Sequence, residues 1–225
     1  MFFAHQSVGS NILNGLELLC SAAHEVAPRI VETRALVQSS SFLAHAKVGM
    51  NRDPRGKLTE FANILDDGLG AEIDVAVMKF CYADVTASTD GTALFDAYCT
   101  AIDDLRERHP GVKFVHATVP LTTDRCWKAK TKALLGRDDR RGPADNLARE
   151  RYNSMVRARY ADTDGVFDIA AVEATMQQQP TVRHLSGQRY LVLNRALSSD
   201  AGHLNSLGSQ VAAAEFVRAL ASTLQ

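Results

Sequence analysis

The stretch FFAHQSVGSNI, residues 2–12, decides the fold because it passes from a strand pattern to a helix pattern within a few residues. Residues 2–4 are apolar and fit the end of a buried strand. From Ile12 onward, apolar side chains recur at helical spacing as far as Ala23. A strand that leads directly into a helix is the repeating unit of an α/β fold, so we expect Ser7 to lie in the turn between them.

The same alternation of strand and helix patterns continues through the chain. Asp53-Pro54 has the pattern of a helix N-cap with proline at the first helical position, and Pro110-Gly111 ends another helical segment. The alternation predicts an α/β fold in three layers, an α/β/α sandwich around a five-stranded parallel sheet. Strands are predicted at residues 2–4, 30–37, 73–80, 112–118 and 165–169, and helices at 12–23, 53–65, 92–109, 143–160 and 207–224.

The length of 225 residues fits a single α/β domain over residues 1–225. One connection, residues 122–146, is basic and polar, holds the only tryptophan, Trp127, and is too long for a simple turn. Long insertions in compact domains are often lids or binding loops. Two alternatives stay open for residues 122–146: a lid over a substrate, and a solvated surface excursion.

The charge and hydropathy patterns exclude several classes of partner. The formal net charge is -1 and no Lys/Arg run is interleaved with aromatic residues, so we expect no nucleic acid partner. No apolar run approaches the roughly 18 residues of a membrane span, and the N-terminus lacks the features of a signal peptide. The chain as written is expected to be soluble and cytoplasmic. Residues 1–4 leave little chain ahead of Ser7, so a further upstream segment and another location stay open.

The four cysteines, Cys20, Cys81, Cys99 and Cys126, form no Cys-x-x-Cys pair and have no metal-ligand spacing with histidine. We expect reduced thiols, no metal site and no organic cofactor. Cys81 differs from the others because it ends an apolar strand, at the edge where active-site residues gather in α/β proteins. A nucleophilic Cys81 paired with His203 is therefore an alternative to a serine nucleophile.

Ser7 and the segment DAGH, residues 200–203, can together supply a nucleophile, a base and a carboxylate. An aspartate three residues ahead of a histidine can fold back and accept the imidazole Nδ1 proton. The Nε2 atom of His203 is then free to take the proton of a serine hydroxyl. This chemistry requires only that the fold brings Ser7 next to His203.

The loops that follow the strands of a parallel sheet meet at one edge, and ligands bind there. Three predicted loops carry polar candidates at this edge: Ser7, Gly49 with Asn51, and residues 81–84.

The order of these residues resembles the SGNH hydrolase superfamily, also called the GDSL esterase/lipases, which has a flavodoxin-like α/β fold. The closest match is SDAGHLN, residues 199–205, followed by Gly208. The segment VFDIA, residues 166–170, resembles the strand that precedes this block in the family. The pattern as a whole resembles a divergent bacterial branch of the superfamily.

This resemblance assigns roles to individual residues. It implies that Ser7 is the nucleophile, that His203 is the base, and that Asp200 orients His203. It also implies that the backbone N–H groups of Ser7 and Gly49 donate to the oxyanion of the reaction.

The chain departs from the family pattern at two places. HQ, residues 5–6, stands where Gly-Asp precedes the serine, and CYAD, residues 81–84, stands where the family has Gly-x-Asn-Asp. Ala83 therefore occupies the position of the asparagine that completes the oxyanion hole. Removing one such donor costs on the order of a hundredfold in rate or more, so a working enzyme needs a substitute.

Asn51, two residues after Gly49, is our predicted substitute for the missing amide, and the Tyr82 phenol is the second choice. We also predict that Tyr82, His45 and Trp127 line the substrate pocket.

The function that the sequence predicts is hydrolysis of an ester by a serine nucleophile. The substrate is expected to be a short-chain acyl or acetyl ester of a carbohydrate or small molecule, by analogy at the level of the fold. Two alternatives stay open: an acyltransferase with the same three residues, and a ligand-binding protein without activity on a degenerate SGNH scaffold.

Overall fold

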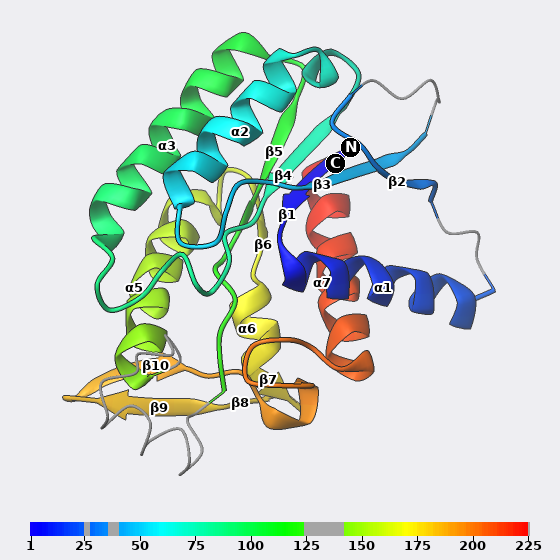
Figure 1. Ribbon diagram of the computed structural model, residues 1–225. Helices are drawn as coiled ribbons and strands as arrows, with labels where there is room; N and C mark the ends of the chain where they lie inside the picture. Colours follow the sequence, from blue (N-terminus) through cyan, green and yellow to red (C-terminus); the bar gives the residue numbers. More distant parts are fainter. Residues whose placement is uncertain (25–27, 36–40, 124–141, 225) are drawn as a thin grey trace.

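The computed structural model describes residues 1–24, 28–35, 41–123 and 142–224, and in this part of the chain one central sheet carries helices on both faces (Figure 1). Its six strands are parallel, in the order β2-β3-β1-β4-β5-β6. The predicted α/β class is confirmed, with six strands in place of five. The strands are β1 (Phe2–His5), β2 (Ile30–Glu32), β3 (Leu43–Lys47), β4 (Val75–Met78), β5 (Lys113–Ala117) and β6 (Gly165–Phe167).

The helices form the outer two layers of the sandwich. Helices cover both faces of the sheet, as Figure 1 shows. On the first face are α1 (Ser7–Ala22) and α7 (Ser206–Leu224), with the short α6 (Ile169–Ala174) beside them; on the second are α2 (Pro54–Asp66), α3 (Gly91–Arg108) and α5 (Pro143–Tyr160). Short elements complete the described chain: η1 (Leu69–Ala71), β7 (Thr175–Met176), β8 (Gln179–Pro180), β9 (Val182–Leu185), β10 (Gln188–Leu191) and η2 (Arg195–Leu197).

Of the six strands of the central sheet, β3 is the one absent from the sequence prediction, and it lies in a segment that we expected to be a loop. Its residues LAHAK lack the β-branched side chains that mark strands. β3 is a strand because it lies between β2 and β1 and pairs with both. β2 in turn covers only the first three residues of the predicted strand at 30–37, and residues 36–40 lie outside the described part of the chain.

The core lies in two apolar layers, one on each side of the sheet. Successive side chains of a strand point to opposite faces, and β1 fills both layers in this way. Phe2 stacks on Phe61 of α2 with ring centroids 6.1 Å apart, while Phe3 packs on Phe216 of α7 at 4.9 Å. Complete burial of one such side chain stabilises the fold by about 1.5–3 kcal/mol. Packing on both faces therefore fixes the end of β1, where Ser7 begins α1.

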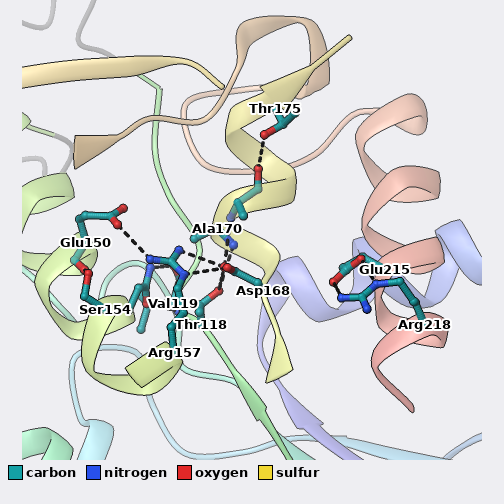
Figure 2. A network of polar contacts seen from close by, with 12 residues as sticks. Thr118, Val119, Glu150, Ser154, Arg157, Asp168, Ala170, Thr175, Glu215 and Arg218 are labelled. Atoms are coloured by element: carbon teal, nitrogen blue, oxygen red, sulfur yellow. Dashed lines mark hydrogen bonds and ion pairs between the residues drawn. The ribbon is translucent and has the colours of Figure 1, made fainter. Parts of the chain in front are cut away.

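A polar network fastens α5 to the carboxyl end of β6 (Figure 2). Arg157 of α5 donates from Nε and Nη2 to the two carboxylate oxygens of Asp168, at 2.7 and 3.0 Å. Its Nη1 atom donates to Glu150 at 2.9 Å, and the Thr118 hydroxyl, just beyond β5, donates to Asp168 at 3.0 Å. A bidentate arginine–carboxylate pair is among the stronger polar contacts in proteins. The network holds the ends of β5 and β6 in place.

Most of the predicted insertion at 122–146 lies outside the described residues, and so do Trp127 and Cys126. The two ends of the insertion meet. The Thr122 N–H donates to Asn146 Oδ1 at 3.1 Å, and Asn146 Nδ2 donates to the Thr122 carbonyl at 2.9 Å. Thr122 and Asn146 therefore join β5 to α5 at one buried point, and the role of the insertion as a lid stays a prediction.

Across the described ranges, no helix is both long and apolar enough to cross a bilayer. Among the same residues, no group of three or more His, Cys, Asp or Glu side chains is placed to hold a metal ion.

Candidate active site

The structure brings Ser7, His203 and Asp200 together in one row of hydrogen bonds. His203 Nε2 lies 3.0 Å from Ser7 Oγ, and His203 Nδ1 lies 2.7 Å from Asp200 Oδ2. Ser7 is the first residue of α1, and the other two residues precede α7. α1 and α7 pack closely because Gly15 has no side chain: a Cβ atom there would lie 2.0 Å from the Ser209 carbonyl oxygen. This helix pair brings residue 7 to residue 203.

Local hydrogen bonds hold the Asp200–His203 turn. Asp200 Oδ1 accepts from the backbone N–H of Gly202 at 2.7 Å and of His203 at 2.9 Å, which leaves Oδ2 for the imidazole. Burial alone would raise the pKa of Asp200, but these N–H groups and the His203 ring outweigh it and hold that pKa below its ordinary value. The carboxylate is therefore ionised and can hold His203 with a proton on Nδ1.

Tyr82 lies against this turn. Its ring meets the His203 ring edge to face, with centroids 6.2 Å apart and an angle of 78° between the planes. Gly202 makes the close approach possible, because a Cβ atom there would lie 2.6 Å from a Tyr82 ring carbon. The structure thus places Tyr82 beside His203; its predicted role as a pocket residue stays a prediction. The predicted alternative nucleophile, Cys81, is buried, and His203 Nε2 faces Ser7 instead.

The N-terminus of α1 can bind an anion next to the Ser7 hydroxyl. The backbone N–H groups of Ser7 and Val8 take no other hydrogen-bond partner among the described residues, whereas the Gly9 N–H donates to the Gln6 carbonyl at 2.7 Å. Free N–H groups and the helix dipole make such an N-terminus favourable for negative charge. Developing negative charge on a substrate at Ser7 would therefore be stabilised.

Gly49 is hydrogen-bonded to Gln6, the residue before Ser7, but its own N–H group has another partner. The side-chain amide of Gln6 donates to the carbonyl oxygens of Val48 and Gly49, at 2.8 Å each, which ties this loop to the residue before Ser7. The Gly49 N–H itself donates to the carboxylate of Glu60 on α2. The predicted use of Gly49 as an oxyanion donor therefore requires that the contact with Glu60 break first.

Asn51 is held by a buried ion pair. Lys57 of α2 donates to Asn51 Oδ1 at 3.1 Å and also forms an ion pair with Asp84, and the side chains of both charged residues are fully buried. Asp84 further accepts from the Cys81 N–H at 2.7 Å and from the Arg52 N–H at 2.8 Å. This pair joins the loop after β3 to the loop after β4. Sequence reasoning missed Lys57, because a lysine in the first turns of a helix reads as a surface residue.

His45 contacts His5 and is not part of the hydrogen-bonded row of Ser7, His203 and Asp200. His45 Nδ1 lies 3.1 Å from His5 Nε2, and the two rings stack with centroids 5.2 Å apart. Burial lowers the pKa of His5 to about 4 and also lowers that of His45, so His5 is neutral near pH 7. The register of β3 against β1 sets His45 opposite Phe3, and His5 lies two residues further along β1 on the same face of the sheet. Contact between His45 and a substrate stays a prediction.

Further ionisable side chains are buried in the domain. Glu173 of α6 accepts from the Leu121 N–H at 2.6 Å, and burial raises its pKa to about 8 despite the nearby charges of Lys79 and Arg149. Arg149 of α5 donates from Nε to the Tyr82 and Val85 carbonyls, at 3.0 and 3.1 Å. We call five such residues the buried ionic floor: Lys57, Lys79, Asp84, Arg149 and Glu173. No sequence pattern pointed to this cluster, since its members come from separate elements.

Comparison with known proteins supports the fold alone. No family model and no curated protein matches the chain. Among solved structures, the chain is similar to a proposed acylhydrolase from Bacteroides fragilis NCTC 9343, with a TM-score of 0.57, 14% identity and coverage of 100% of this chain and 87% of the other. A proposed lipolytic protein of the G-D-S-L family from Desulfitobacterium hafniense DCB-2 has a TM-score of 0.55, 9% identity and coverage of 97% and 98%. A proposed GDSL-like lipase from Parabacteroides merdae ATCC 43184 has a TM-score of 0.54, 10% identity and coverage of 98% and 94%.

The chain therefore has an SGNH/GDSL hydrolase-like fold, at low sequence identity to these structures.

Proposed function

We propose that the protein is a serine hydrolase that cleaves an ester through Ser7, His203 and Asp200. The observation that supports this most is the unbroken row of hydrogen bonds, 3.0 Å from Ser7 Oγ to His203 Nε2 and 2.7 Å from His203 Nδ1 to Asp200 Oδ2. Both distances are those of a nucleophile beside its base and a base beside its orienting carboxylate.

The reaction would proceed in two stages. Ser7 Oγ attacks the acyl carbonyl while His203 Nε2 takes its proton; His203 then gives that proton to the leaving alcohol, and an acyl-serine forms. His203 next takes a proton from water, the hydroxide attacks the acyl-serine, and the acid leaves as the proton returns to Ser7. Asp200 stays ionised throughout and stabilises the imidazolium.

The oxyanion would be bound by the Ser7 N–H at the start of α1 and by the side-chain amide of Asn51. Gly49 can add its N–H only when the contact with Glu60 is broken. Each donor aimed at the developing charge contributes about a hundredfold or more to the rate.

The substrate class that we propose is a short acyl or acetyl ester of a sugar or small alcohol. Support comes from the fold, which the chain shares with a proposed acylhydrolase and with proposed GDSL-like lipases. Tyr82 beside His203 would form one wall of this pocket.

The experiment that tests the function combines labelling by a fluorophosphonate probe with hydrolysis of p-nitrophenyl acetate. We expect the wild-type protein to be labelled and active. Ser7→Ala and His203→Ala should each lose at least about 10³-fold in kcat and lose labelling, because nucleophile and base act as one unit. Ser10→Ala, one turn further along α1, is the matched control and should keep both. Absence of labelling in folded wild-type protein would contradict the proposal and favour a binding role.

A further inference from the structure

The absence of an asparagine at position 83 raises the question of what supplies the missing oxyanion donor. The answer rests on the proposed ester hydrolysis at Ser7 and on one buried lysine. Lys57 extends from α2 beneath the loop after β3, its side chain is fully buried, and its ammonium group contacts both Asn51 Oδ1 and Asp84.

The chemistry of these groups fixes which way the Asn51 amide points. A lysine ammonium has three N–H donors and no acceptor, so it can bind only the oxygen end of an amide. The Nδ2 end of Asn51, with two N–H donors, is therefore turned away from Lys57. It has no hydrogen-bond partner among the residues that the structure describes, and Asn51 is exposed.

The loop after β3 leaves room for the Lys57 side chain at Gly49. A Cβ atom at Gly49 would lie 2.6 Å from Lys57 Cγ and 3.0 Å from its Cα, so only glycine leaves room for this side chain. Gly49 also has a φ of 55° and Arg52 a φ of 80°, backbone conformations that cost free energy in residues other than glycine. The Arg52 N–H donates to Asp84, which holds this strained turn against the ion pair.

The same loop is tied to the nucleophile. Gln6, the residue before Ser7, donates to the Gly49 carbonyl at 2.8 Å, and Asn51 follows two residues later. We propose that Lys57 is a positioning residue that fixes the Asn51 amide with its N–H donors toward the oxyanion formed at Ser7. Asp84 holds Lys57 in place, and Asn51 takes the part of the asparagine absent at position 83.

A double-mutant cycle tests whether Lys57 acts through Asn51. We would measure kcat and KM for p-nitrophenyl acetate in the wild type, Asn51→Ala, Lys57→Met and the double variant. Asn51→Ala should lower kcat about a hundredfold or more, and Lys57→Met should lower it by a smaller factor, while KM stays within about threefold in both. The double variant should be no slower than Asn51→Ala, because the lysine then has no amide to orient.

Lys57→Met removes the ion-pair partner of the buried Asp84, and this variant can fail to fold for that reason. A second variant, Asn51→Asp, then still tests the proposal. Asn51→Asp retains an oxygen for Lys57 but has no N–H donor. If the contact only supports the loop, Asn51→Asp keeps wild-type activity; if the amide donates to the oxyanion, kcat falls at least as far as in Asn51→Ala. Asn63→Asp makes the same change on an exposed position of α2 and is the matched control.

The outcomes separate this proposal from the function on which it rests. Loss of kcat in Asn51→Asp with Ser7 still labelled by the fluorophosphonate probe supports the role of Lys57 and Asn51. Wild-type kcat in Asn51→Asp, or losses that multiply in the double variant, overturn it while ester hydrolysis stands. Failure of wild-type protein to label at Ser7 overturns the function first.

Discussion

The row of Ser7, His203 and Asp200 differs from the buried ionic floor in its contact with water. The Asp200 side chain is 54% exposed and that of His203 is 31% exposed, whereas both side chains of the Lys57–Asp84 pair are fully buried. Water can solvate the charges of the row when a partner is removed, but an unpaired charge in the floor has no such compensation. Substitutions in the row should therefore lower the catalytic rate with little effect on the stability of the fold. Substitutions in the floor should lower stability and displace the loops that it holds.

The largest expected effect comes from breaking the row at its exposed end. Asp200→Asn should lower kcat about 10³- to 10⁴-fold, because a neutral amide holds His203 without selecting the tautomer that leaves Nε2 free. The midpoint of urea unfolding should change little, since the asparagine oxygen can still accept from the turn N–H groups. Asp104→Asn, on the exposed side of α3, serves as the control. A loss in kcat below tenfold would show that Asp200 does not orient the base.

A smaller effect, on stability alone, should come from Glu173 in the floor. Burial raises its pKa from 4.5 to about 8 in the folded protein. The folded state thus keeps a proton that the unfolded state loses, so stability is present below about pH 4.5 and is lost as the pH rises toward 8. When the pH rises from 5 to 8, the free energy of unfolding should fall in the wild type. In Glu173→Gln it should fall by about 3 kcal/mol less.

Urea unfolding at these two pH values measures the difference. The matched control is Glu72→Gln, which removes an exposed carboxylate and should keep the wild-type dependence on pH. If Glu173→Gln shows the same dependence of stability on pH as the wild type, Glu173 is ionised in the folded protein and the prediction is wrong.

The smallest effect should arise where the two regions join, at Gly49. Gly49→Ala should lower the free energy of unfolding by about 1–3 kcal/mol, because alanine is strained at a φ of 55° and its Cβ would press on Lys57. Gly187→Ala has the strain of a φ of 79° but open space around the new atom, so it should cost less. Urea unfolding of both variants compares them. Equal losses would mean that Lys57 is not confined beneath the loop.

Much of the fold could be predicted from the sequence because its signals are local. The change from strand to helix at Ser7, the proline at the start of α2 and the stop at the end of α3 each depend on neighbouring residues. β3 could not be predicted in the same way. Its small side chains carry no strand pattern, and only its place between β1 and β2 makes it a strand.

The sequence by itself determined the α/β class, the Asp200–His203 pair and the position of Ser7 at a strand end. These depend on contacts between residues a few positions apart, which a linear pattern can encode. Only the tertiary structure decided that Lys57 reaches Asp84, 27 residues away, and that the Gly49 N–H faces Glu60. Such contacts depend on the packing of α2 over the strand ends, where the depth of burial turns an ordinary helix lysine into an internal charge.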